Sequence, residues 1–175
     1  LDLNVGGVMV YARTRQAAAA LSQAVQAGHL QKEYLALVHG RPHPSAGAWE
    51  DLLWKDSGKN KVFVVRRMRK GVKAASLSYR VLETREALTL VHVRLHTGRS
   101  HQIRVQFASR GFPLVGDHKY GSRDEAKSPA LWSFRLTLPH PVAGHTITCS
   151  HRPEGMPWQS FPSISREIFP WAEDC

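Results

Sequence analysis

Five short apolar segments follow one another at close intervals through the middle of the sequence. The first, KEYLALVHG at residues 32–40, is apolar at both alternating sets of positions, which is typical of a strand buried on both faces. Charged or turn-forming residues separate the four that follow, WEDLLW, KVFVVRRM, AASLSYRVLE and LTLVHVRLH. Such spacing is typical of an antiparallel meander. The central part of the chain is therefore predicted to be a β-sheet.

The segments on either side of this sheet predict further strands and a helix. VGGVMVYA, residues 5–12, is apolar and β-branched and indicates a buried strand, and ALWSFRLTLPHP and HTITCSH indicate two more. Residues 15–27 carry apolar side chains at helical intervals, with Thr14 placed to cap the helix and Gly28 to end it. We expect this amphipathic helix to lie on the sheet. With no internal repeat or linker, the pattern predicts one α+β domain over residues 1–175.

The charge balance indicates the class of partner. The formal net charge is +10, and the sequence pI is about 10.1, which favours nucleic acid over an anionic membrane surface. No run approaches the ~18 apolar residues of a membrane span, and no segment has the layout of a signal peptide, so we expect a cytoplasmic protein. Cys149 and Cys175 form no CxxC pair, so neither a zinc site nor a disulfide is predicted. The chain opens at Leu1 without a methionine, which indicates a fragment.

The stretch LHTGRSHQIRVQFASRG contains two arginines whose roles the residues alone leave open. Residues 101–110 predict a helix, because Ile103 and Phe107 share one face before a glycine. Arg99 precedes the helix, where free N–H groups favour an anion. Arg104 lies at the border of the apolar face, where an arginine either extends to water or pairs with a carboxylate. Spacing alone favours the extended, solvated arginine.

Three further features each allow a structural and a functional interpretation. His92, His96 and His101 lack a carboxylate at a metal-ligand spacing such as HExxH, so no metal site is predicted and a metal-dependent nuclease is the weakest functional alternative. Tyr34 is by default an amphipathic core residue, and alternatively an aromatic platform for a base pulled out of an RNA stack. The basic cluster RRMRKGVK, residues 66–73, is either a solvated turn or a phosphate contact.

Four ordered motifs together resemble the RluA-type family of RNA pseudouridine synthases. LDLNVGGVMVYART is similar to the family's catalytic segment, KEYLALVHG to its strand with lysine and tyrosine, and LWSFRLTLPHPVAG to its closing strand. TGRSHQIRVQFASRGFPLVGDHKYG matches the longest family signature almost throughout, and the resemblance spans about residues 1–162. It implies the pseudouridine synthase catalytic domain, an α+β fold with a mixed, mainly antiparallel sheet and flanking helices. The family also has strands before Leu1, which this chain lacks.

The resemblance implies roles for six residues. Asp2 corresponds to the nucleophilic aspartate, Arg104 to the arginine that pairs with it, and Tyr34 to the tyrosine that stacks on the target base and takes the proton from C5. The remaining three contact the substrate in the implied site, with Ile103 as an apolar contact of the pocket and Arg99 and His101 holding the RNA backbone or the active-site loop.

The implied reaction converts a uridine in rRNA or tRNA to pseudouridine, by breaking the N1–C1′ bond, turning the uracil and rejoining it through C5. It requires no metal or organic cofactor. We expect RNA as the partner, no membrane, and a monomer. Val5 and Gly6 stand where many family members have threonine and serine, which leaves a non-catalytic RNA-binding module as the alternative.

Overall fold

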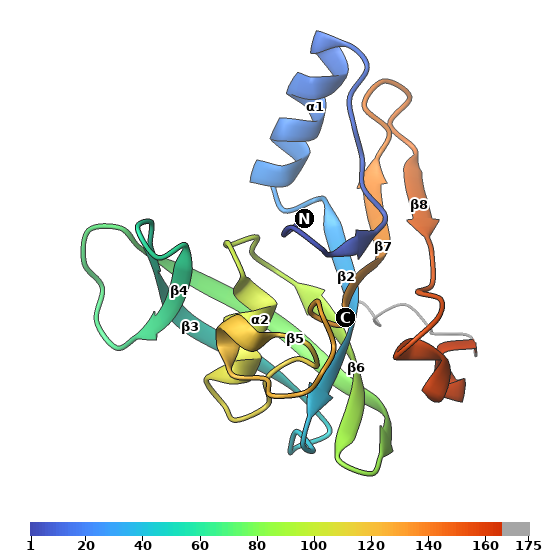
Figure 1. The fold of residues 1–175 in the computed structure, drawn as a ribbon. Coiled ribbons are helices and arrows are strands. Elements are labelled where there is room, and N and C mark those ends of the chain that lie inside the picture. Colours follow the sequence, from blue (N-terminus) through green and yellow to red (C-terminus); the bar gives the residue numbers. More distant parts are fainter. Residues whose placement is uncertain (166–175) are drawn as a thin grey trace.

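The computed structural model describes residues 1–165, which form one eight-stranded sheet (Figure 1). The strand order is β1-β7-β2-β6-β5-β3-β4, and β8 also pairs with β7. All pairings are antiparallel except that of β1 with β7, so the predicted mixed, mainly antiparallel sheet is confirmed. The strands are β1 Gly6–Gly7, β2 Gln31–His39, β3 Ala46–Asp56, β4 Lys61–Val65, β5 Val72–Arg85, β6 Leu88–Leu95, β7 Leu131–Pro139 and β8 Thr146–Ser150.

The middle of the sheet differs from the predicted meander. β3 lies between β4 and β5, since Leu52 pairs with Val65 on one side and with Ala74 on the other. β4 spans 5 residues and is the edge strand of the sheet. β3 spans 11 residues and β5 spans 14, and the two strands pair along most of β3. The chain therefore passes from β4 to the far side of β3, and the basic residues 66–70 in this connection are exposed.

The predicted buried strand over residues 5–12 is wrong for most of its length. Of residues 5–12, only Gly6 and Gly7 form a strand, β1, which pairs with β7. Val8 makes the last backbone contact there, donating to the carbonyl of Ser133 over 2.8 Å. A Cβ atom at Gly6 would lie 2.3 Å from the ring of Trp132, so the close approach of β1 to β7 requires glycine. Beyond Val8 the chain leaves the sheet, and the exposed side chains are those of Met9, Val10 and Tyr11.

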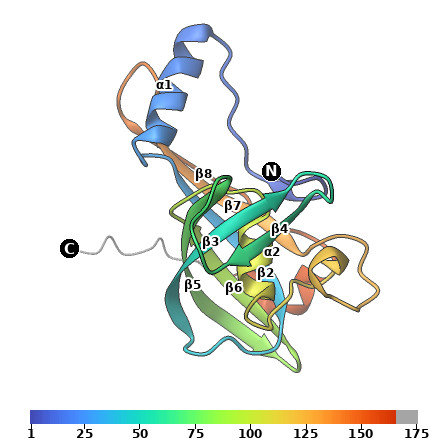
Figure 2. The ribbon, with the colours of Figure 1, turned by 90° about the vertical axis from the view of Figure 1, so that its left-hand side faces the viewer.

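The helix α1, Arg15–Gln26, has the predicted ends but not the predicted packing. The hydroxyl oxygen of Thr14 accepts a hydrogen bond from the amide of Ala17 at 3.1 Å, and Gly28 has a φ of +75°. The only buried residue of α1 is Ala24. Figures 1 and 2 both show the helix beyond one end of the sheet, near the β7–β8 hairpin. Its alanine-rich surface offers little apolar area, so the helix covers no face of the sheet.

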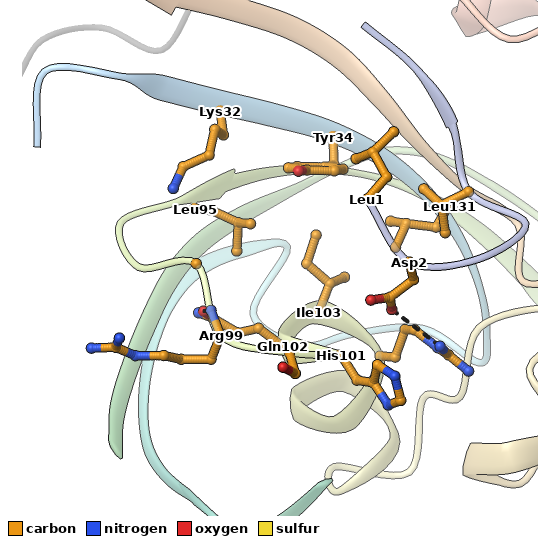
Figure 3. A pocket seen from close by; sticks show the side chains of 14 residues that line it. Leu1, Asp2, Lys32, Tyr34, Leu95, Arg99, His101, Gln102, Ile103 and Leu131 are labelled. Carbon is orange, nitrogen blue, oxygen red and sulfur yellow. Dashed lines mark hydrogen bonds and ion pairs between the residues drawn. The ribbon is translucent and has the colours of Figure 1, made fainter. Parts of the chain in front are cut away.

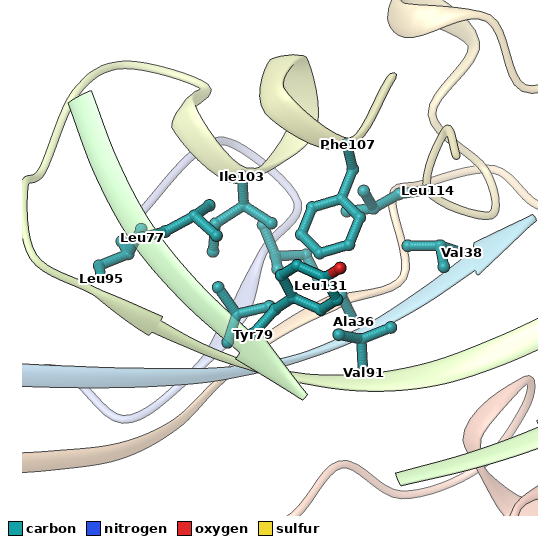
Figure 4. Close-up of a cluster of buried hydrophobic side chains, with 11 residues drawn as sticks. Ala36, Val38, Leu77, Tyr79, Val91, Leu95, Ile103, Phe107, Leu114 and Leu131 are labelled. Carbon is teal, nitrogen blue, oxygen red and sulfur yellow. The ribbon is translucent and has the colours of Figure 1, made fainter. Parts of the chain in front are cut away.

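The helix α2, Gln102–Ala108, crosses one face of the sheet and forms the main core with it (Figure 4). Ile103 and Phe107 point down onto the strands, as their spacing predicts, and the ring of Phe107 is fully buried against Trp49 and Tyr79. The helix begins later than predicted, because His101 has a left-handed φ of +51°. On the other face, β2, β6 and β7 pack against the 3-10 helices Trp158–Ser160 and Pro162–Ser165.

Substitution of Phe107 tests the core beneath α2. We expect Phe107→Ala to lower the free energy of unfolding by about 3–5 kcal/mol, because it leaves a cavity between the helix and the sheet. Val25 on α1 is 53% exposed, and Val25→Ala should change the free energy by less than about 0.5 kcal/mol. Urea denaturation measures both changes. Similar losses in the two variants would contradict this description of the core.

Candidate active site

A pocket of about 280 Å³ lies where the N-terminal segment, β2 and the start of α2 meet (Figure 3). Residues more than 100 positions apart in the sequence share it, since Asp2 and Arg104 are 102 apart. Leu1, Leu95 and Leu131 supply apolar wall, while Lys32 and Gln102 add polar groups that the sequence analysis did not select. All six residues predicted for the site line the pocket, namely Asp2, Tyr34, Arg99, His101, Ile103 and Arg104.

Arg104 is buried and holds two carboxylates at once. Its Nε and Nη2 donate to the two oxygens of Asp117, each over 2.7 Å, and its Nη1 donates to Oδ2 of Asp2 over 3.1 Å. The guanidinium therefore does not extend to water as spacing alone suggested, and only 7% of Arg104 is exposed. Burial by itself would lower the pKa of Arg104, but the hydrogen bonds and charges of Asp117, and then of Asp2, raise it above its ordinary value. Arg104 stays charged at any pH at which the protein is folded.

Asp117 fixes the orientation of Arg104, and the sequence analysis assigned this residue no role. The side chain of Asp117 is fully buried, and its fork contact uses two donors of the guanidinium, so that Nη1 points towards Asp2. Gly116 beside it has a φ of +75°, and a Cβ there would lie 2.1 Å from the carbonyl oxygen of Ser128. The loop therefore requires glycine to bring Asp117 under the helix.

Asp2 is the partly exposed member of this cluster, with 24% of its side chain accessible. Oδ2 is engaged by Arg104, while Oδ1 accepts no hydrogen bond from the described residues. In Figure 3 the oxygen not joined to Arg104 faces the interior of the pocket. The carboxylate thus has one oxygen that is held and one that is available to a bound molecule.

Tyr34 and Ile103 form opposite walls of the pocket. Figure 3 shows the ring of Tyr34 edge-on along one side, with Ile103 facing it from α2 and Asp2 at one end. Burial raises the pKa of Tyr34, a hydrogen bond with Ser133 opposes the rise, and the charge of Asp2 adds to it. The phenol therefore stays protonated near neutral pH. A flat ring facing an aliphatic side chain fits a planar, uncharged group.

His101 lines the pocket near Asp2 and contacts Tyr120. The hydroxyl of Tyr120 accepts a hydrogen bond from the amide of Val62 at 2.8 Å and lies 2.8 Å from Nδ1 of His101. Burial lowers the pKa of His101, although the charge of Asp2 opposes this change. The neutral ring, with Nδ1 accepting from Tyr120, fits these contacts. The Tyr120 ring also faces the guanidinium of Arg104, 5.1 Å from ring centre to Cζ.

The other two histidines lie outside the pocket. His92 is fully buried on the opposite face of the sheet, with Nε2 2.7 Å from Oε2 of Glu33, and His96 lies 2.7 Å from the hydroxyl of Ser78. Within residues 1–165 no cluster of three metal-ligating side chains occurs, and no helix is long and apolar enough to cross a membrane. Cys149 is exposed on β8, and Cys175 lies outside the described residues.

The sequence pattern of the family described as RNA pseudouridylate synthase matches residues 1–109. The chain belongs to this family. A protein of Aquifex aeolicus called an uncharacterized RNA pseudouridine synthase is 33% identical over 180 residues, which cover 99% of this chain and 55% of that protein. Ribosomal large subunit pseudouridine synthase D of Yersinia pestis is 37% identical over 138 residues, which cover 79% of this chain and 41% of that protein. The chain spans about half the length of the curated relatives it matches.

Two solved human structures share the fold of this family member. RNA pseudouridylate synthase domain containing 1 aligns with a TM-score of 0.68 at 23% identity and covers 81% of this chain, which in turn covers 62% of that structure. RNA pseudouridylate synthase domain containing 4 aligns with a TM-score of 0.69 at 21% identity. That alignment covers 89% of this chain and 70% of that structure. The fold class expected from the resemblance, a pseudouridine synthase domain with a mixed sheet and flanking helices, is confirmed.

One signal in the sequence could have identified Asp117. A guanidinium carries five donors in a rigid fork, and burial requires most of them to be satisfied. Asp2 alone cannot satisfy a buried Arg104, so further acceptors near α2 are required, and a carboxylate is the strongest of these. Asp117, in the family signature, follows Arg104 by 13 positions.

Acid titration tests the loop that carries Asp117. Asp124 accepts hydrogen bonds from the amides of Gly116 and Ala126 and contacts His39 and Ser122. Burial would raise the pKa of Asp124, but these hydrogen bonds hold it well below its usual range. Its carboxylate therefore stabilises the fold above the unfolded-state pKa of about 3.9, and this stabilisation is lost as the pH falls.

We expect Asp124→Asn to lower the free energy of unfolding at pH 7 by about 1–3 kcal/mol, with the difference from wild type shrinking towards pH 3. Urea denaturation across this pH range measures the difference. Glu125→Gln is the control, because Glu125 is next to Asp124 in the sequence but its side chain is exposed. A loss for Asp124→Asn that stays constant with pH would refute the assigned hydrogen bonds.

Proposed function

We propose that this chain is the catalytic part of an RNA pseudouridine synthase that isomerises uridines in rRNA or tRNA to pseudouridine. The observation that carries the proposal is the contact of Arg104 with Asp2 at one end of a pocket walled by Tyr34. Membership of the family and the names of the relatives support the same reaction class. The activity and its RNA substrate are inferred for this chain.

Asp2 acts as the nucleophile in the proposed reaction. A carboxylate attacks only when it is ionised, and a neighbouring positive charge favours that state. Arg104 supplies the charge through Oδ2, and Oδ1 remains available towards the pocket. Because Asp117 occupies the other side of the guanidinium, Arg104 cannot turn away from Asp2 without breaking a buried ion pair.

Tyr34 and Ile103 hold the target base in the proposed complex. A base must leave the RNA stack before its glycosidic bond is accessible, and an aromatic ring compensates part of the stacking that is lost. The raised pKa of Tyr34 favours stacking over proton abstraction, because removal of the C5 proton by Tyr34 would require the phenolate. We therefore assign Tyr34 the stacking role.

The proposed reaction is atom-balanced without a cofactor. In the proposed reaction Oδ1 of Asp2 attacks C1′ of uridine as the N1–C1′ bond breaks. The uracil turns within the pocket, and C5 then forms the new bond to C1′ and displaces Asp2. The proton that leaves C5 passes to solvent and N1 takes up a proton from solvent, so substrate and product are isomers. Asp2 and Arg104 supply the charges near the breaking bond, while Tyr34 and Ile103 keep the base in place as it turns.

Asp2→Asn is the direct test of the nucleophile, since it keeps the shape of the side chain and removes the charge. We expect pseudouridine formation in transcribed rRNA and tRNA to fall by at least about a thousandfold. Carbodiimide-based mapping measures the modified positions. Asp51→Asn is the matched control, because Asp51 pairs with Arg110 outside the pocket and should retain activity. Equal yields from wild type and Asp2→Asn would reject the catalytic role, and RNA binding without product by either protein would support the binding-module alternative.

Asp117→Asn tests whether the second carboxylate positions Arg104. The amide presents a donor to the guanidinium in place of an acceptor, so the fork contact is lost. We expect a free-energy loss of about 3–5 kcal/mol, and a lower rate in the folded variant at saturating RNA with little change in RNA affinity. Single-turnover rates and urea denaturation measure these quantities, again against Asp51→Asn. A destabilised variant with the wild-type rate would limit Asp117 to a structural role.

A further inference from the structure

Two cations lie at the end of the pocket away from Asp2. Figure 3 shows Lys32 from β2 and Arg99 from the turn before α2 both at this end. A Cβ atom added to Gly98 would lie 3.2 Å from Nζ of Lys32, so the lysine rests against the turn that carries Arg99. Burial lowers the pKa of Lys32, and the charge of Arg99 lowers it further. Lys32 and Arg99 thus make this end of the pocket positive, which favours an anion there.

The turn that carries Arg99 is fixed by buried contacts. Gln102 is 3% exposed, accepts hydrogen bonds from the amide of Arg99 and the hydroxyl of Thr97, and donates to the carbonyl of Ser76. The Nε of Arg99 donates to the carbonyl of Ala74 over 2.9 Å, which leaves its two terminal nitrogens to other partners. The guanidinium is thus held in place before any ligand arrives, and less entropy is lost on binding.

A second hollow, of about 160 Å³, begins on the other side of the same turn. It shares Gly98, Arg99 and Ser100 with the first pocket and is lined at its far end by Lys55 and Lys73. Both lysines are exposed. Lys73 pairs across the sheet with Leu53, and Lys55 with Val62, which place both lysines on the face that packs against α2. The two hollows therefore form one continuous surface over the turn.

The positive charges of this surface are not neutralised by nearby carboxylates. In the part of the chain that the structure describes, no carboxylate pairs with any of its four cations, Lys32, Arg99, Lys55 and Lys73. Neither hollow is lined by an acidic side chain except Asp2, at the opposite end of the first. Unpaired cations in a row along a groove suit a backbone of repeated phosphates.

We propose that Lys32 and Arg99 bind the phosphate next to the target nucleotide, and that Lys55 and Lys73 bind the phosphates that follow. The RNA strand then leaves the pocket over the Gly98–Ser100 turn towards the β3–β4 hairpin, rather than along α1 and β8. This track rests on the proposed function for its ligand. It assigns the RNA path to residues that the reaction itself does not require.

The salt dependence of RNA binding tests the track. The probe is a fluorescein-labelled, uridine-containing single-stranded RNA, with Kd measured by anisotropy between about 50 and about 300 mM salt. For Lys55→Gln with Lys73→Gln, the slope of log affinity against log salt should become shallower by about 1.4, since each phosphate contact contributes about 0.7 on a single strand. Lys55→Arg with Lys73→Arg should keep the wild-type slope.

The matched control removes two positive charges elsewhere. Arg41 and Lys127 are exposed and lie near the end of β2 opposite Lys32, so Arg41→Gln with Lys127→Gln should keep the wild-type slope. Equal changes in both double variants would mean that only net charge matters and would overturn the track. The measurement needs no turnover. An unaltered slope with Asp2-dependent modification intact would reject the track alone, whereas absence of product from wild type would reject the proposed function alone.

Discussion

The buried guanidinium of Arg104 is the constraint on which the rest of the site depends. A charge in the interior is tolerated only when its donors are satisfied, and Arg104 requires two carboxylates from distant parts of the chain. Asp117 binds Nε and Nη2 of the guanidinium, and Asp2, from the N-terminal segment, binds Nη1. The ion pairs therefore join the start of the chain to α2 and to the loop after it. The same contacts that satisfy burial also orient the carboxylate that faces the pocket.

The sheet supplies the rigidity that this arrangement requires. α2 is only seven residues long, and its own hydrogen bonds could not hold Arg104 in place. Phe107 and Ile103 anchor it to the strands, and Tyr34 stands on β2 beside that core. Both walls of the pocket and the charged cluster at its end thus share one packed framework. Substrate positioning to within a fraction of an ångström depends on such support.

The parts of this fold that repeat a local pattern could be predicted from the sequence, and the parts that depend on distant partners could not. The strand from Gln31 to His39 and the α2 face of Ile103 and Phe107 follow from apolar spacing alone. The place of β4 at the edge follows from pairing preferences among three strands, which no local pattern encodes. Residues 8–12 look like a buried strand because β-branched residues favour one, yet within residues 1–165 they pair no further than Val8.

The site shows the same division. The resemblance selected Asp2, Tyr34 and Arg104 because they stand in family motifs, and the structure brings all three to one pocket. Lys32 stands in the same motifs but carried no signal of its own, and Asp117 could have been found only from the unmet hydrogen-bonding needs of a buried Arg104. Spacing placed Arg104 correctly at the border of the apolar face. Its burial depended on Asp117, whose approach requires the turn at Gly116.

In the proposed RNA complex, the distribution of charge along the pocket gives the bound nucleotide a direction. Arg104 lies between Asp2 and Asp117, so that end carries a net negative charge, whereas Lys32 and Arg99 make the other end positive. A phosphate near Asp2 would be repelled, and one near Lys32 attracted, and both effects are stronger in a partly desolvated pocket than in water. An uncharged base is the part of a nucleotide that can lie against Tyr34 beside Asp2 without electrostatic cost. In the proposed complex, the negative end at Asp2 and Asp117 therefore takes the base, and the positive end at Lys32 and Arg99 takes the phosphate.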